Sequence, residues 1–324
     1  MKAILCKQFG PPSSLTLEDI PSEPIKKGHI RIQVRACGLN FPDTLIIQGK
    51  YQFKPDFPFS PGSDIAGVVT EVGDGVKNFK VGDEAVAMIG WGGFREEVVA
   101  AAKVCFPKPP NMDFSMAASF MMTYGTSYHA LKDRGRLKEG ETLLVLGASG
   151  GVGLTAVELG KKMGAKVIAA ASTAEKLALC KAYGADEVIN YTEENIKERV
   201  KELTEGNGAN VIYDPVGGVQ TELALRAIAW KGRYLVVGFA AGDIPKIPLN
   251  LPLLKGCQIV GVFWGAFAQK EAAKNMQNTM ELMQYFFRGE LKPHIHATYP
   301  LEKTPEALQE IMDRKVKGKI ILEL

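Results

Sequence analysis

The chain has 324 residues, enough for about two domains of ordinary size. Hydrophobic residues make up 46% and charged residues 23%, and the net charge is +3, which is the balance of a soluble globular protein and too weakly basic for nucleic acid or a membrane surface. No apolar run approaches the length of a membrane-spanning helix, and the chain reaches Lys7 too early for a signal peptide, so we expect a cytoplasmic protein.

Residues 1 to about 123 have the pattern of short strands separated by turns. β-rich runs lie at 2–6, 15–20, 30–36, 65–72, 84–88 and 94–100. Turn signals such as Gly10-Pro11-Pro12 and Gly73-Asp74-Gly75 separate them, and one short helix is expected at 41–48. Closely spaced strands with such turns are typical of a partly open β-barrel or a sandwich.

The pattern changes near Thr123, where apolar strands begin to alternate with helices. Strands are expected at 143–146, 167–170, 187–189, 211–213, 234–237 and 259–263, and helices at 152–163, 174–183, 193–203 and 220–229. This alternation predicts a parallel sheet covered by helices on both faces. A long helix at 270–288 and a last strand at 319–324 complete the chain. We therefore expect a discontinuous β-rich domain, residues 1–123 and 265–324, with an α/β domain, residues 124–264, inserted into it.

The strongest local motif is the glycine-rich segment from Gly147 to Gly153, which follows a predicted strand and opens a predicted helix. This is the context that a dinucleotide-binding loop requires. Gly147 permits the tight turn, Gly150 and Gly151 let backbone N–H groups approach a pyrophosphate, and Gly153 lets the helix pack against the sheet. The helix N-terminus then presents N–H groups to the phosphates.

The end of the next strand distinguishes between the two nicotinamide cofactors. An NAD site usually has Asp or Glu there, which binds the ribose 2′-hydroxyl. Here the strand runs into Ser172-Thr173, with Lys176 one helical turn later, and these side chains suit a 2′-phosphate. Glu175 is the one nearby acid, and it can pair with Lys176 or point to solvent. The pattern favours NADPH.

Longer motifs, spread over nearly the whole chain, carry a family resemblance. They are Ala36–Asp43, Pro58–Val69, Val81–Asp83, Thr126–Leu131, Gly147–Gly153 and Asp214–Gly218, together with Trp230–Phe239 and Phe263–Gly265. With these motifs the chain resembles the zinc-free quinone oxidoreductase branch of the medium-chain dehydrogenase/reductase family. The resemblance implies a GroES-like domain, a Rossmann domain and usually a homodimer.

The resemblance also bears on zinc. Zinc-dependent members have Cys where this chain has Asn40 and a His-Glu pair where it has Ser63-Asp64, and they carry a run of cysteines that is missing after the Gly93 region. Without thiolate or imidazole ligands no stable zinc site is expected, which removes the Lewis acid for alcohol oxidation. Hydride transfer to an acceptor already activated by conjugation, such as a quinone or an enone, needs no metal.

Functional roles follow from the resemblance, residue by residue. Asn40, Asp43 and Tyr51 are the candidate catalytic residues, in a cleft between the domains. The implied cofactor positions are Asn40 and Thr126 near the nicotinamide; Ser149, Gly150, Gly151 and Val152 at the pyrophosphate; Ser172, Lys176 and Tyr191 at the 2′-phosphate; Gly238, Phe239, Phe263 and Gly265 along the channel; and Lys319.

Three functions fit this sequence. The first is an NADPH-dependent quinone oxidoreductase, which transfers hydride to a quinone without zinc. The second is an NADPH-dependent reductase of α,β-unsaturated carbonyls of the enone, acryloyl-CoA or 2-haloacrylate type. The third, less favoured, is a non-enzymatic NADPH-binding protein. We expect a small-molecule substrate, no nucleic-acid or membrane partner, and a homodimer whose seam is the edge strand at 259–263.

Overall fold

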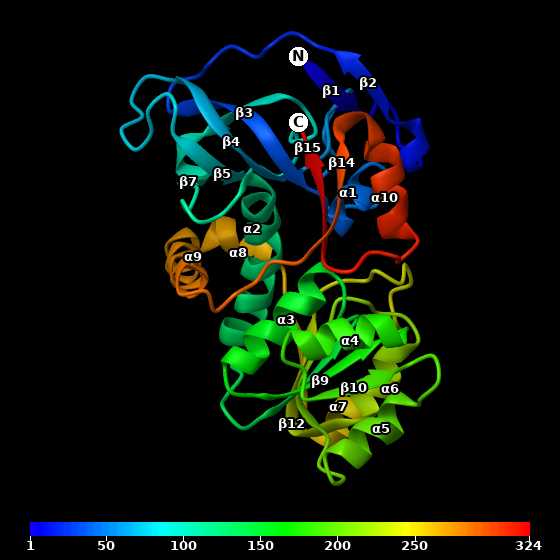
Figure 1. Cartoon of the computed structure of the whole chain (residues 1–324). Coiled ribbons are helices and arrows are strands. Elements are labelled where there is room, and N and C mark those ends of the chain that lie inside the picture. The colour runs from blue at the N-terminus through cyan, green and yellow to red at the C-terminus, as the bar shows by residue number, and fades with distance from the viewer. The chain divides into compact units, whose positions relative to one another are not determined.

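The computed structural model describes residues 1–324 and divides into two compact units (Figure 1). Unit 1 comprises Met1–Met122 and Lys292–Leu324, and unit 2 comprises Thr123–Leu291. The first crossing between the units falls inside helix α2 (Phe114–Tyr128). None of the helices is both long enough and apolar enough to cross a membrane.

Unit 1 is built around an antiparallel sheet of seven strands. Its path runs β14-β15-β3-β4-β5-β7, with β6 also pairing with β3, and a separate pair is formed by β1 and β2. The strands are β1 (Lys2–Leu5), β2 (Thr16–Asp19), β3 (His29–Gly38), β4 (Asp64–Val72), β5 (Glu84–Met88), β6 (Glu97–Ala101), β7 (Cys105–Pro107), β14 (Ile295–Pro300) and β15 (Lys319–Glu323). This sheet agrees with the partly open β-barrel that the strand spacing predicts for this part of the chain. Only the β14–β15 pair is parallel.

The β-barrel of unit 1 encloses one apolar core. The inward residues of β3, such as Ile30, Ile32 and Val34, alternate with more exposed ones and are fully buried there. Two helices lie on this unit, α1 (Phe41–Ile46) and α10 (Thr304–Met312), with 3₁₀ turns η1 (Pro12–Ser14), η2 (Ala102–Val104) and η4 (Leu301–Lys303). The N- and C-terminal parts of the chain thus share one core.

Unit 2 is a parallel six-stranded sheet in the order β10-β9-β8-β11-β12-β13. The strands are β8 (Thr142–Leu146), β9 (Lys166–Ala171), β10 (Glu187–Asn190), β11 (Ala209–Asp214), β12 (Ile228–Val236) and β13 (Gln258–Gly261). The helices are α3 (Gly151–Lys162), α4 (Ala174–Ala182), α5 (Ile196–Leu203), α6 (Gln220–Arg226), α7 (Asn250–Lys255), α8 (Trp264–Lys270) and α9 (Ala272–Phe287), with a π-helical turn η3 (His129–Arg134) after α2.

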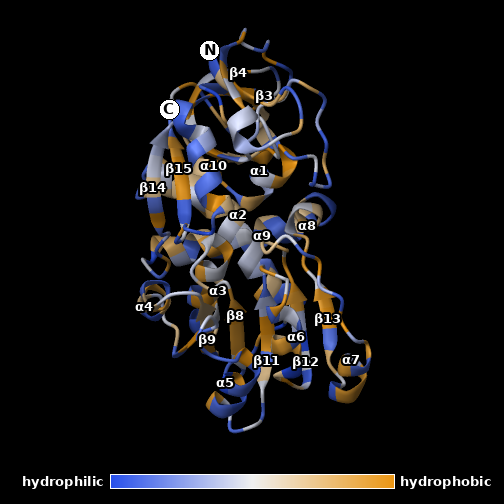
Figure 2. Ribbon diagram, turned by 90° about the vertical axis from the view of Figure 1, so that its right-hand side faces the viewer, coloured by the Kyte–Doolittle hydropathy of each residue, from blue (hydrophilic) through white to orange (hydrophobic).

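Helices cover both faces of this parallel sheet, as the continuous apolar strands require. On one face, residues of α5, α6 and α7 pack with strand residues such as Leu144 and Ile212. On the other, Gly160 of α3 lies against Leu143 and Val167. Figure 2 shows the central strands β8 and β11 as largely hydrophobic ribbons between these helices. The predicted doubly wound parallel sheet is confirmed.

The second crossing between the units lies later in the chain than we expected. Residues 265–291 were assigned to the β-rich domain, but they belong to unit 2. Their contacts explain why. Helix α9 is held by Glu281, which pairs with Lys132 and accepts a hydrogen bond from Tyr128, and by Asn278, which donates to Asp133 at 2.7 Å. These partners all lie on α2 and η3, within unit 2.

The long helix expected at 270–288 is confirmed as α9, and the structure adds a short helix, α8, directly before it. The chain leaves helical geometry at Glu271, whose φ of −123° and ψ of 48° separate α8 from α9. No glycine or proline marks this break in the sequence. Trp264, at the start of α8, is buried, and its Nε1 donates to Asn275 Oδ1 of α9 at 3.0 Å. Packing of the two helices on each other therefore decides the break.

Candidate functional site

The glycine-rich loop of unit 2 has the geometry that the sequence predicts. Gly147 follows β8 with a φ of +56°, and a Cβ atom at Gly153 would lie 2.2 Å from the Gly147 carbonyl oxygen. Only glycine allows these two turns of backbone to approach so closely. The first internal hydrogen bond of α3 joins Leu154 N to Gly150 O at 2.8 Å, and Gly150 N donates to Gly147 O at 3.0 Å. The N–H groups of residues 151–153, at the start of the helix, therefore remain available to phosphate oxygens.

The residues expected at a 2′-phosphate come together at the end of β9. Lys176 Nζ lies 3.5 Å from Ser172 Oγ, because Thr173 caps α4 and places Lys176 on the first turn of that helix. Tyr191 follows β10, and its backbone N–H donates to Ala171 O at 3.2 Å, next to Ser172. All three side chains are partly buried. Together they offer a cation and hydroxyl groups, the chemistry that suits a phosphate.

The other predicted cofactor positions of unit 2 are distributed over several elements. Ser149 is buried in the glycine-rich loop, and Thr126 is buried in α2. Gly238 and Phe239 follow the carboxyl end of β12, whereas Phe263 and Gly265 stand at the start of α8. The role of each of these positions in binding the cofactor remains a prediction. Three of them, Ser149, Gly238 and Phe239, follow the carboxyl ends of parallel strands.

In unit 1 the predicted catalytic residues Asn40 and Asp43 are adjacent and buried. Asn40 precedes α1, and its backbone N–H donates to Asp43 Oδ2 at 2.7 Å. The Gly62 N–H donates to the other carboxylate oxygen, Oδ1, at 3.2 Å. The Asn40 amide nitrogen donates to Asp64 Oδ2 at 3.1 Å. At the start of α1, Asn40 therefore donates hydrogen bonds to two acidic side chains, Asp43 and Asp64.

Lys319 of β15 completes this group, which we call the Asn40 cluster: Asn40, Asp43, Asp64 and Lys319. The Lys319 ammonium donates to Asn40 Oδ1 at 2.6 Å and to the Leu39 carbonyl at 2.7 Å, and it lies 3.8 Å from Asp64 Oδ2. Each of the four side chains is at most 6% exposed. A buried ammonium thus stands among two carboxylates and a carboxamide.

Burial perturbs every ionisable member of the Asn40 cluster. It raises the pKa of Asp43 to about 7, although the Asn40 N–H and Lys319 oppose the rise. It raises the pKa of Asp64 to about 6, against the opposing effect of Lys319 and the Asn40 amide. The same desolvation lowers the pKa of Lys319, and the two carboxylates counteract it. Two acids and one base with shifted pKa values in one enclosed group are typical of sites that handle protons.

The Tyr51 hydroxyl is influenced by the charge of the Asn40 cluster. It is half-buried against the apolar core, and burial, followed by the charge of Asp43, raises the pKa of its hydroxyl. Its ring contacts Phe53 edge to face at 5.8 Å between centroids. A phenol with a raised pKa stays protonated at neutral pH and acts as a donor.

Sequence reasoning missed the place of Asp64 and the true surroundings of Lys319. Asp64 was noticed only as a residue that stands where relatives carry a metal ligand, and Lys319 only as a group that reaches the cofactor. The structure places the Lys319 ammonium, from the last strand of the chain, against Asn40, and the contact of Lys319 with the cofactor remains a prediction. The Ser63-Asp64 pair beside Asn40 was the available signal for this grouping.

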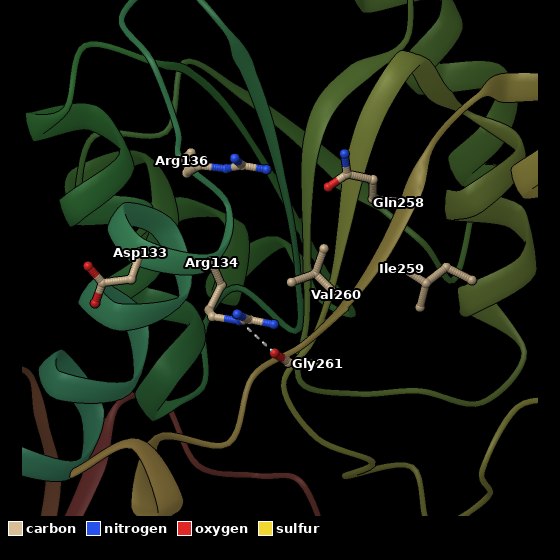
Figure 3. Close-up of a pocket in the computed structure, with 7 residues that line it drawn as sticks. All are labelled: Asp133, Arg134, Arg136, Gln258, Ile259, Val260 and Gly261. Atoms are coloured by element: carbon tan, nitrogen blue, oxygen red, sulfur yellow. Dashed lines mark hydrogen bonds between the residues drawn. The ribbon is translucent and has the colours of Figure 1, made fainter. Parts of the chain in front are cut away.

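A separate cavity of about 620 Å³ opens at the edge of the parallel sheet in unit 2 (Figure 3). It is lined by Asp133, Arg134, Arg136, Gln258, Ile259, Val260 and Gly261. Arg134 Nε donates to the Gly261 carbonyl at 3.0 Å, the interaction drawn as a dashed line in Figure 3. None of the predicted cofactor residues lines this cavity. It belongs to the free edge of β13.

Comparison with protein-family models gives two matches. Residues 26–110 match the alcohol dehydrogenase GroES-like domain, and residues 151–284 match the zinc-binding dehydrogenase domain. The first lies in unit 1 and the second in unit 2.

Whole-chain relatives agree with these matches. A quinone oxidoreductase-like protein 2 homolog of Nematostella vectensis is 42% identical, over 99% of this chain and 88% of its own length. The quinone oxidoreductase of Pseudomonas syringae pv. Tomato superposes with a TM-score of 0.94 at 32% identity, covering 100% of this chain and 99% of that one. The Escherichia coli quinone oxidoreductase complexed with NADPH superposes with a TM-score of 0.93 at 28% identity, covering 100% of both chains.

Proposed function

This chain belongs to the quinone oxidoreductase branch of the medium-chain dehydrogenase/reductase family, and on that premise we propose that it is an NADPH-dependent enzyme that reduces a quinone by zinc-independent hydride transfer. The observation that carries the proposal is the glycine-rich loop between β8 and α3, together with the Ser172–Lys176 pair at the end of β9. It is an oxidoreductase, like the relatives to which it is similar.

The residues of unit 2 fit a dinucleotide phosphate. The backbone of Gly147–Gly153 leaves N–H groups at the α3 N-terminus for the pyrophosphate, and no side chain projects from its glycines into that space. Lys176 and Ser172 hold the 2′-phosphate, for which a carboxylate at the strand end would be repulsive. When bound there, NADPH supplies the hydride that the acceptor receives.

Zinc independence is supported by the charge that already stands in the Asn40 cluster. The Lys319 ammonium donates to Asn40 Oδ1 and faces Asp64, so a fixed cation already balances the acids there. A second, divalent cation at this point would meet the repulsion of the ammonium in a low-dielectric interior. The donor set is also short of the thiolate and imidazole ligands that zinc prefers.

Reduction of a quinone to a hydroquinone consumes one hydride and, for the anion first formed, one proton. Asp43 is proposed to hold that proton, because it is buried beside Asn40 and burial raises its pKa to about 7. Tyr51, protonated at that pH, is the second candidate donor. Asn40 holds the cluster together, since its amide links Lys319 to Asp64. In this proposal these residues position and move protons, and NADPH supplies the hydride.

We also propose that the protein is a homodimer joined at β13. This strand ends the sheet order, so one side of it presents unpaired backbone groups. Ile259 on the strand is 40% exposed, and on the neighbouring elements Trp230, Leu249 and Leu253 are 66%, 79% and 78% exposed. Large apolar side chains beside a free strand edge favour pairing with a second copy about a two-fold axis.

The decisive experiment follows NADPH oxidation by absorbance, with phenanthrenequinone, benzoquinone, methyl vinyl ketone and acryloyl-CoA as acceptors and NADH as the control cofactor. The proposal predicts saturable quinone reduction with NADPH and a much lower rate with NADH. Reduction of the enone or the thioester, with poor quinone turnover, would make it a reductase of α,β-unsaturated carbonyls. Tight NADPH binding without turnover would identify a binding protein.

A further inference from the structure

The parallel sheet of unit 2 reverses its direction of growth between β8 and β11. From β8 the chain adds β9 and β10 on one side, and then returns to add β11, β12 and β13 on the other. Ligands of open α/β sheets bind beyond the carboxyl ends of the strands at such a switch point. The residue that ends β11 there is Asp214, which is 3% exposed.

Asp214 accepts four hydrogen bonds through its carboxylate. Oδ1 accepts from Val216 N at 2.8 Å and Gly217 N at 2.9 Å. Oδ2 accepts from Thr221 Oγ1 at 2.9 Å and Tyr234 Oη at 2.5 Å. Because an ionised carboxylate only accepts hydrogen bonds, it can satisfy all four groups at once, including the two backbone N–H groups, which can only donate.

The main chain of Asp214 extends this arrangement to the next strand. Its carbonyl accepts from Val237 N at 2.9 Å and from Gly238 N at 3.3 Å, just beyond β12. The two loops then bond directly to each other, since Ala240 N donates to Pro215 O at 3.1 Å and Ala241 N donates to Val216 O at 2.8 Å. The loop after β11 and the loop after β12 thus form one hydrogen-bonded body.

This body also touches the glycine-rich loop. A Cβ atom at Gly147 would lie 2.6 Å from Val216 Cγ2, so the Val216 side chain packs directly on the turn that follows β8. On its other side Gly217 abuts Phe239, whose ring lies 2.9 Å from the position a Gly217 Cβ would take. One buried carboxylate therefore fixes the loops that follow three strands, β8, β11 and β12.

We infer that Asp214 is a positioning residue for the dinucleotide: it holds Val216 and Gly217 in place and, through them, sets the glycine-rich loop and the Gly238–Phe239 segment for the cofactor. This inference rests on the proposed function, because it takes the cofactor to bind at these loops. Asp214 acts on parts of the site that NADPH and NADH share, whereas Lys176 acts on the 2′-phosphate alone.

The test measures the Kd of the purified full-length protein for NADPH and for NADH, by nicotinamide fluorescence, in the wild type and in Asp214→Asn. The amide has one acceptor oxygen where the carboxylate has two, and it carries no charge, so one pair of donors must reorient and all four hydrogen bonds lose the strength that the charge gives them. We expect the Kd for both cofactors to rise by about tenfold, which is ~1.4 kcal/mol. Tyr234→Phe removes one of the four donors and should raise both values by about threefold.

Asp186→Asn is the matched control. Asp186 also accepts a backbone hydrogen bond, from Val167 N at 2.8 Å, and pairs with Lys161, but it stands at the amino end of the sheet. It should lower the thermal unfolding temperature and leave both Kd values within about twofold. Equal effects of Asp214→Asn and Asp186→Asn on Kd would refute the positioning role.

Other outcomes also discriminate. If Asp214→Asn fails to fold, Tyr234→Phe and Thr221→Val take its place, and unchanged Kd values in both would refute the inference. If Asp214→Asn weakens NADPH binding but leaves NADH binding unchanged, Asp214 acts on the 2′-phosphate site and the inference is wrong. If the wild type binds neither cofactor, the proposed function itself fails, and this result differs from all the others.

Discussion

Replacing Lys319 by methionine tests the electrostatic account of the Asn40 cluster. The change keeps the length and apolar stem of the side chain but removes the ammonium. Leu39 O and Asn40 Oδ1 lose their donor, and Asp43 and Asp64 lose the cation that opposes the rise in their pKa values. The buried carboxylates are then left without compensating charge.

The expected loss is large because all the groups involved are buried. Lys319 is 5% exposed and Asp64 is 2% exposed. Removing one member of a buried ion pair typically costs about 3–5 kcal/mol of unfolding free energy. By contrast, Lys303 pairs with Glu306 on the surface, where the two side chains are 56% and 53% exposed. Lys303→Met should leave the unfolding free energy nearly unchanged, because solvent screens this exposed pair.

The unfolding free energy lost in Lys319→Met should also grow with pH. Asp64 has a folded pKa of about 6, above its ordinary 3.8, so its contribution to stability is fully present below 3.8 and is lost as pH rises through 6. Without the ammonium the folded pKa rises further, and the loss continues at higher pH. The difference between variant and wild type should therefore widen above pH 6 by up to ~1.4 kcal/mol per pH unit for each such carboxyl.

Hydrogen exchange followed by mass spectrometry measures the unfolding free energy of unit 1 by itself. The exchange rates of peptides from β3 and β4 are corrected for the intrinsic exchange rate. Wild type, Lys319→Met and Lys303→Met are compared at about pH 5.5 and about pH 8. A Lys319→Met effect below about 1 kcal/mol, or one of equal size at both pH values, would refute the reasoning.

Four further predictions concern the proposed function. Lys176→Ala should raise the Kd for NADPH by about tenfold and leave that for NADH nearly unchanged, because it removes a charged partner of the 2′-phosphate; equal weakening of both would contradict the assignment. Asn40→Ala should lower turnover by up to about a hundredfold, with a smaller effect on NADPH affinity, and unchanged kcat would remove Asn40 from the site. Ile259→Asp should convert a dimer into monomers in light scattering, and a wild type that is already monomeric would overturn the seam at β13. Metal analysis of the purified protein should find less than one equivalent of zinc, whereas a full equivalent would contradict zinc-independent transfer.

The pattern of the sequence was enough to predict the two kinds of architecture and the dinucleotide loop. Strand spacing with turn signals predicted the β-rich unit, and the alternation of apolar strands with helices predicted the parallel sheet. Local rules suffice for these features, because side-chain period and turn chemistry act over a few residues. The loop at Gly147–Gly153 is likewise local, since strand, turn and helix are consecutive in the chain.

Features made by distant segments depended on the tertiary structure. No local signal places residues 265–291 with unit 2, because contacts with distant segments, such as that between Asn278 and Asp133, decide it. The same holds for Lys319, which lies more than two hundred residues after Asn40 in the sequence and meets it only because β15 pairs with β3. Asp214 was visible in the sequence only as part of a motif. Its four donors come from the next loop, from α6 and from β12, and folding of the sheet brings them to a single carboxylate.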